Sequence, residues 1–62
     1  MSTASHLTAA QRDRAERLAR LEALYDRVEF RAWVAERAGR TADADRLYRT
    51  LDAINARIGA LL

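Results

Sequence analysis

The chain has 62 residues, no cysteine, no proline and a formal charge of +2, which is the balance of eleven arginines and nine acids. The missing cysteines exclude disulfides, thiolate zinc sites and cysteine nucleophiles. Below about 70 to 80 residues a lone hydrophobic core rarely supplies more than ~3–5 kcal/mol, so we expect the chain to gain stability by association with another chain.

The first predicted element is a helix over about 8–38, which follows a leader over 1–7. Thr8 and Gln11 have the spacing of a capping box, in which each side chain accepts a hydrogen bond from the other residue's backbone. Apolar residues then recur at alternating steps of three and four, the heptad period of a helix that packs along one stripe. This first stripe comprises Leu18, Leu21, Tyr25, Val28, Ala32 and Ala35.

Gly39 predicts the end of this helix, because glycine readily takes the left-handed conformation found just beyond helix ends. We expect a turn over 39–41 and a second helix over about 42–61, with Thr41 as its N-cap. A second stripe of the same period comprises Ala44, Leu47, Leu51, Ile54, Ile58 and Leu61.

A connection this short predicts an all-α fold: a two-helix antiparallel hairpin, coiled-coil-like, spanning 1–62 as one unit. We expect it to be completed as a four-helix bundle or docked on a partner. The first helix is the longer one, so its polar first turns, about 9–17, should project beyond the second. Acid-before-base spacing predicts three ion pairs, Asp13–Arg17, Glu16–Arg20 and Asp45–Arg49. The flank formed by Glu22, Glu29 and Glu36 should face Tyr48 and Asn55.

Three large apolar residues, Phe30, Trp33 and Val34, lie on the far side of the first helix from its stripe. Such a cluster is typical of a contact surface, and tryptophan is enriched where partners bind most tightly. Asp26 and Arg37 would form its polar rim. In the alternative interpretation, Trp33 folds over the alanine-rich end of the hairpin and covers Ala38 and Ala42.

A nucleic-acid interpretation rests on an arginine-rich segment of the predicted overhang that contains Arg12, Arg14, Arg17 and Arg20. The segment Ala44-Asp45-Arg46-Leu47-Tyr48-Arg49 resembles a short piece of the second helix of the Rop family of plasmid RNA-binding hairpins, which implies RNA binding by a helical hairpin. That resemblance covers six residues, and the first helix does not match. Gly39, Arg40, Ala44 and Tyr48 are similar to the turn and second helix of one tetratricopeptide unit, which implies a stacked neighbour.

The sequence offers no paired nucleophile and base, no phosphate-binding glycine loop and no metal-ligand spacing. We therefore expect no catalytic, cofactor or metal site, no small-molecule substrate and no membrane span. The expected function is a non-catalytic protein interaction or assembly module in the cytoplasm, either self-associating or docked as a small subunit or adaptor. The alternative is an RNA- or DNA-binding hairpin.

Overall fold

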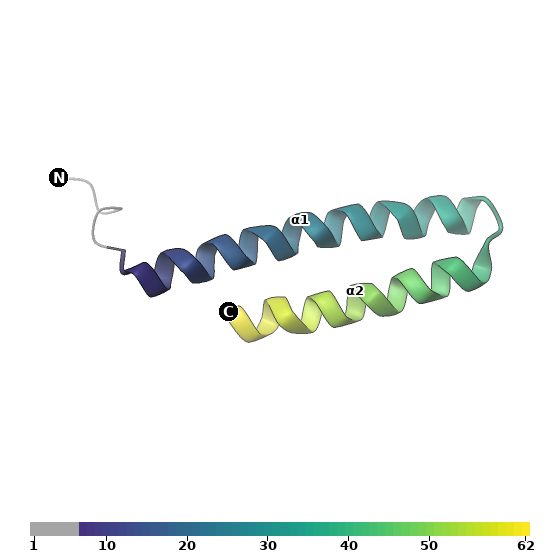
Figure 1. Ribbon diagram of the computed structural model, residues 1–62. Coiled ribbons are helices and arrows are strands. Elements are labelled where there is room, and N and C mark those ends of the chain that lie inside the picture. Colours follow the sequence, from purple (N-terminus) through teal and green to yellow (C-terminus); the bar gives the residue numbers. More distant parts are fainter. Residues whose placement is uncertain (1–6) are drawn as a thin grey trace.

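The computed structural model describes residues 7–62, which form two helices, α1 (Ala9–Arg37) and α2 (Thr41–Leu61), and no strand. The helices lie side by side and antiparallel, and the beginning of α1 extends past the end of α2 (Figure 1). The predicted all-α hairpin is thus confirmed. Positions 1–6 of the expected leader lie outside the described residues.

The start of α1 is fixed by the capping box predicted for Thr8 and Gln11. The Gln11 backbone N–H donates to Thr8 Oγ1 at 3.0 Å, and the Thr8 backbone N–H donates to Gln11 Oε1 at 2.8 Å. Two backbone donors that would otherwise lack partners at a helix end are therefore satisfied. Thr8 is the cap itself, so the first helical residue is Ala9, one residue later than expected.

The turn between the helices is three residues long, 38–40, and is built around Gly39 at φ 76°. The Gly39 N–H donates to the Glu36 carbonyl at 3.1 Å and the Arg40 N–H donates to the Ala35 carbonyl at 2.8 Å. This pair of bonds is the Schellman pattern of helix ends.

Thr41 is not the N-cap of α2, contrary to the sequence prediction. The cap is Arg40, whose carbonyl already accepts the first helical bond, from the Ala44 N–H at 3.0 Å. The Arg40 N–H thus donates to α1 and the Arg40 carbonyl accepts from α2, which leaves no room for a separate capping residue. Thr41 becomes the first helical residue, and no side chain caps α2.

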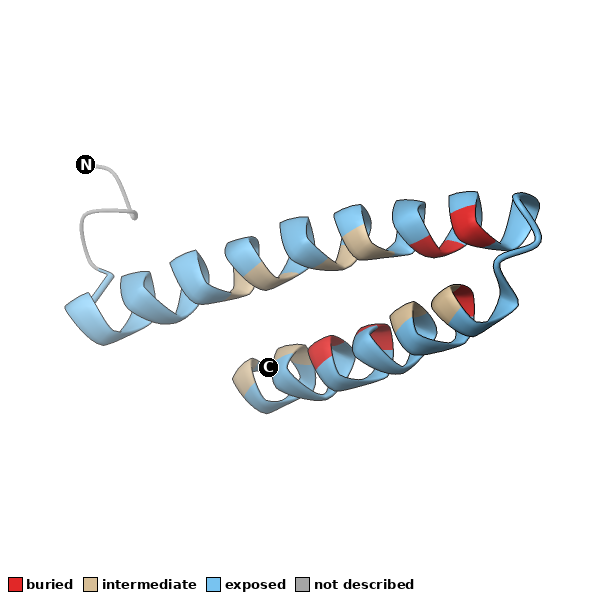
Figure 2. Ribbon diagram, turned by 45° about the vertical axis from the view of Figure 1, so that its right-hand side comes forward, coloured by how far each residue is buried: buried red, intermediate tan, exposed pale blue. Residues whose placement is uncertain are grey.

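The seam between the helices consists of the two predicted stripes. All twelve stripe residues are buried or half-buried, and within residues 7–62 the only other residue that is not exposed is Asp43. The buried set is small and lies in the half of the hairpin nearer the turn (Figure 2). It comprises Ala32, Ala35, Ala44, Leu51 and Ile54. Three of these five are alanines, so the core contains only two large apolar side chains.

The hairpin is a single layer of helices. Its principal extents are 54 × 20 × 11 Å, and its radius of gyration is 15.8 Å. A compact chain of this length would have a radius of gyration of about 11 Å. Stable domains are usually built from two packed layers. Both broad faces of this layer are therefore open.

No helix within residues 7–62 is long and apolar enough to cross a membrane.

Candidate interaction surface

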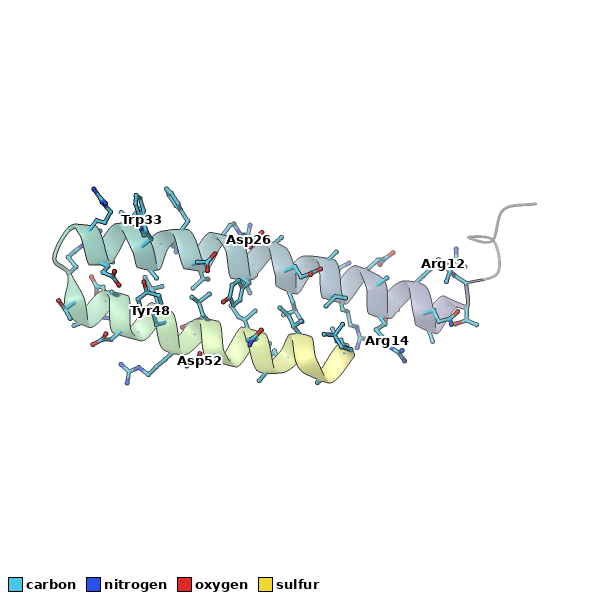
Figure 3. All side chains as sticks on the ribbon, turned by 180° about the vertical axis from the view of Figure 1, so that it is seen from behind. Arg12, Arg14, Asp26, Trp33, Tyr48 and Asp52 are labelled. Carbon is cyan, nitrogen blue, oxygen red and sulfur yellow. The ribbon has the colours of Figure 1, made fainter. Side chains whose placement is uncertain are left out.

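The large apolar side chains predicted to lie outside the hairpin seam are exposed in the structure. Phe30 is 63% exposed, Trp33 is 50% exposed and Val34 is 37% exposed. They are spaced three and four residues apart, which places them on one side of α1. Trp33 projects from α1 away from α2 (Figure 3). With Asp26 and Arg37 beside them, these residues form what we call the aromatic patch.

Contacts within the aromatic patch hold its side chains in place. The rings of Phe30 and Trp33 stack with their centroids 6.2 Å apart and their planes inclined by 30°. The Arg37 guanidinium carbon lies 5.0 Å from the centroid of the Trp33 ring, within the range of a cation–π contact. Ala38 and Ala42 remain exposed. The structure therefore stacks the indole on Phe30 and does not bury these alanines beneath it.

Tyr48 of α2 lies beside the aromatic patch. Its hydroxyl donates to Glu36 Oε2 at 2.9 Å, as the predicted meeting of the glutamate flank with Tyr48 requires. This hydrogen bond is the main cause that raises the pKa of Tyr48 above its ordinary 10.0, and the charge of Glu29 acts in the same direction. Tyr48 also lines an open groove with Asp26, Glu29, Phe30 and Trp33.

The four arginines of the nucleic-acid alternative are all exposed. Arg17 pairs with Asp13 at 2.9 Å and Arg20 lies 3.8 Å from Glu16, as the spacing predicted. Arg12 and Arg14 project from different sides of α1 (Figure 3). The overhang thus carries arginines around much of its circumference, half of them beside acids, and does not gather them on one surface.

The third predicted ion pair, Asp45–Arg49, does not form in the structure. Arg46 instead pairs with Asp43 at 2.9 Å, across a spacing of three residues. Asp43 lies in the first turn of α2 and is half-buried. Asp45 is exposed.

Sequence reasoning missed how charge is divided between the two open sides of the hairpin. It identified the flank of the first helix formed by Glu22, Glu29 and Glu36, but it did not include Arg27 of that helix or Arg46 and Arg57 of the second on the opposite side. In the structure these arginines line the grooves along one side of the hairpin. The sequence could have predicted this division of charge, because the position of each arginine around its helix relative to the heptad stripe follows from its spacing.

No group of three or more metal-ligating side chains is placed to hold a metal ion within residues 7–62. Comparison of the chain with known protein families, with curated proteins and with solved structures found no match.

Proposed function

We propose that this chain is a non-catalytic assembly element that associates with further copies of itself through a surface centred on the aromatic patch. The single observation that carries the proposal is the exposure of Phe30, Trp33 and Val34 side by side on a hairpin only one layer thick. A four-helix arrangement made from two hairpins would supply the missing layer. The cytoplasmic location expected from the sequence is part of this proposal.

The energetics favour association over a solitary hairpin. Burying one Leu or Ile side chain contributes about 1.5–3 kcal/mol. Among the large side chains of the seam only Leu51 and Ile54 are buried, and the others are half-buried. The aromatic patch holds more apolar area than either of these residues, because an aromatic side chain can bury about 150–250 Å². The stacked rings also lose little further freedom on binding, which lowers the cost of association.

RNA or DNA binding by Arg12, Arg14, Arg17 and Arg20 is the alternative function. It receives less support from the geometry, because two of these arginines already lie beside acids and the other two point in different directions. Phosphate recognition by neutralising charge requires arginines free to approach the same backbone.

Sedimentation equilibrium of the full chain over a wide concentration range tests the proposal. We expect a mass above the 7.0 kDa of one chain, rising with concentration. Trp33→Ala removes about 100 Å² of exposed aromatic surface, worth ~2.5 kcal/mol at ~25 cal/mol/Å². That reduction corresponds to association roughly 60-fold weaker. Helix content should persist, because alanine improves helix propensity by ~0.5 kcal/mol, which offsets the absence of the cation–π interaction with Arg37.

Leu62→Ala is the matched control, because Leu62 is 87% exposed and lies outside the aromatic patch. It should leave the association constant unchanged. A wild-type chain that remains a monomer at every concentration would refute the proposal. So would a Trp33→Ala chain that associates as tightly as wild type. A salt-dependent complex with RNA, abolished in Arg12→Glu/Arg14→Glu, would establish the alternative instead.

A further inference from the structure

The two open sides of the hairpin carry opposite charge. Along one side run two grooves, lined by Glu22, Tyr25, Asp26, Asn55 and Ile58 and by Asp26, Glu29, Phe30, Trp33 and Tyr48. These grooves contain three acids and no arginine, and we call this side the acidic face. Glu36, which holds Tyr48, belongs to the same side.

The other side, the basic face, has three grooves and a different set of residues. Seven arginines line them: Arg17, Arg20, Arg27, Arg31, Arg40, Arg46 and Arg57. The only acid that lines them is Asp43, which pairs with Arg46. Arg17 pairs with Asp13, and Arg20 lies 3.8 Å from Glu16. Arg27 and Arg31 form no ion pair with any residue in 7–62, so their charge is available to a partner.

Helix geometry places these two faces on opposite sides of the layer. Glu29 and Arg31 are two residues apart on α1, and so point in directions about 160° apart. Arg46 and Tyr48 have the same relation on α2. Phe30 lines one groove on each face, because it lies on the side of α1 opposite the seam, between the two faces.

This division of charge restricts how two copies can associate. A two-fold symmetric dimer joins a surface to the same surface of its partner. Pairing two acidic faces or two basic faces would bring like charges together, which costs free energy. Pairing a basic face with an acidic face brings opposite charges together, but it leaves one face of each kind uncovered for a further copy.

We infer that copies of this chain stack head to tail, with the basic face of one hairpin on the acidic face of the next, so that assembly is open-ended. This inference rests on the proposed function and specifies its geometry. In such a stack the aromatic patch is covered from the acidic side, where Trp33 and Tyr48 share a groove. The arginines of the incoming basic face then lie against aromatic rings and carboxylates, both of which attract guanidinium groups.

The spacing of charges on α1 suits such an arrangement. Arg20 and Arg27 are seven residues apart, as are Glu22 and Glu29. Seven residues correspond to about 10.5 Å along a helix, so one register can align both ion pairs at once.

Apolar side chains beneath the arginines favour a protein partner over a nucleic acid. Leu21 and Leu61 lie in the groove with Arg17, Arg20 and Arg57, and Leu24 and Val28 lie in the groove with Arg27 and Arg31. A helical layer can cover these leucines, whereas a phosphate backbone gains nothing from them.

Charge exchange between two variants tests the inference. Arg27→Glu/Arg31→Glu reverses the charge of two residues in the middle of the basic face, and Glu22→Arg/Glu29→Arg reverses the charge of two residues on the acidic face. All four positions are exposed, so helix content should not change. Each variant alone should associate at least about tenfold more weakly than wild type. A 1:1 mixture should restore assembly, because the first variant keeps the natural acidic face and the second keeps the natural basic face.

Sedimentation velocity of the wild type should show a mass that grows without a plateau at the dimer and falls at high salt, which screens surface charge. If the wild type stops at a dimer, and both variants form it equally well alone and mixed, the inference fails while the proposed function stands. A wild type that never associates overturns both. If wild type binds mixed RNA and Arg27→Glu/Arg31→Glu does not, the basic face binds nucleic acid and the inference is wrong.

Discussion

Replacing Ala32 by leucine tests whether the seam is as closely packed as the structure indicates. Ala32 is 0% exposed and lies where α1 faces α2 near the turn. Leucine adds three carbon atoms at a site with no free surface, and inserting such groups into a packed core costs about 1–3 kcal/mol. A hairpin of this size has only ~3–5 kcal/mol of stability in total, so the destabilisation should be a large fraction of it.

The assay is urea unfolding followed by circular dichroism at 222 nm, at a concentration low enough to keep the chain monomeric. With a dependence on urea of about 1 kcal/mol/M for a small protein, the midpoint should fall by roughly 1–3 M. Ala53→Leu makes the same chemical change at an exposed position of α2 and should alter stability by less than ~0.5 kcal/mol. Equal midpoints for the two variants would show that the helices do not approach closely at Ala32.

Two further predictions concern the turn and Tyr48. Gly39→Ala should destabilise the hairpin by about 1–2 kcal/mol, because an L-residue with a side chain is strained at φ 76°. An added Cβ meets nothing within 4 Å, so no steric contact adds to this effect. Gly59 lies in the last turns of α2 and an added Cβ there also meets nothing within 4 Å, so Gly59→Ala should stabilise the hairpin by up to ~1 kcal/mol. Equal urea midpoints for the two variants would contradict the role of the left-handed turn. Because the folded chain raises the pKa of Tyr48, the stability that its hydroxyl contributes should be complete below pH 10 and lost as the pH rises through the raised pKa. Tyr48→Phe should lack this pH-dependent loss in unfolding measured between pH 8 and 11, and an identical profile for the two proteins would mean that the bond to Glu36 contributes nothing.

Local signals in the sequence predicted most of the fold. The bonds between Thr8 and Gln11 depend on residues three apart, and Gly39 acts through its own backbone, so neither needs knowledge of the rest of the chain. The two heptad stripes were also sufficient to identify the seam, because each helix has only one other helix to pack against. The capping of α2 was predicted wrongly because Arg40 takes part in both helices, and a pattern that treats each helix separately does not anticipate this.

The surfaces were harder to predict than the seam. Exposure of Trp33 followed from its position opposite the stripe, but its stacking on Phe30 and its interaction with Arg37 depend on side-chain conformations. The division of charge required both helices at once, since Arg46 and Arg57 add to the side of Arg27 only when α2 is rotated to bury its own stripe. Pairs such as Asp43–Arg46 and Asp45–Arg49 have similar strength on an exposed helix, so sequence spacing alone does not decide between them.

The tight turn also determines what happens if the hairpin opens. The Arg40 N–H is bonded to α1 and its carbonyl is bonded to α2, so moving α2 away from α1 as a unit requires one of these hydrogen bonds to break. Separation requires Gly39 to leave its left-handed conformation, after which 38–40 can join α1 and α2 into one uninterrupted rod. Two such rods could then exchange halves, each α2 lying in the seam of the other chain. A connection this short would favour domain swapping once the hairpin opens, and the left-handed conformation of Gly39 opposes that opening.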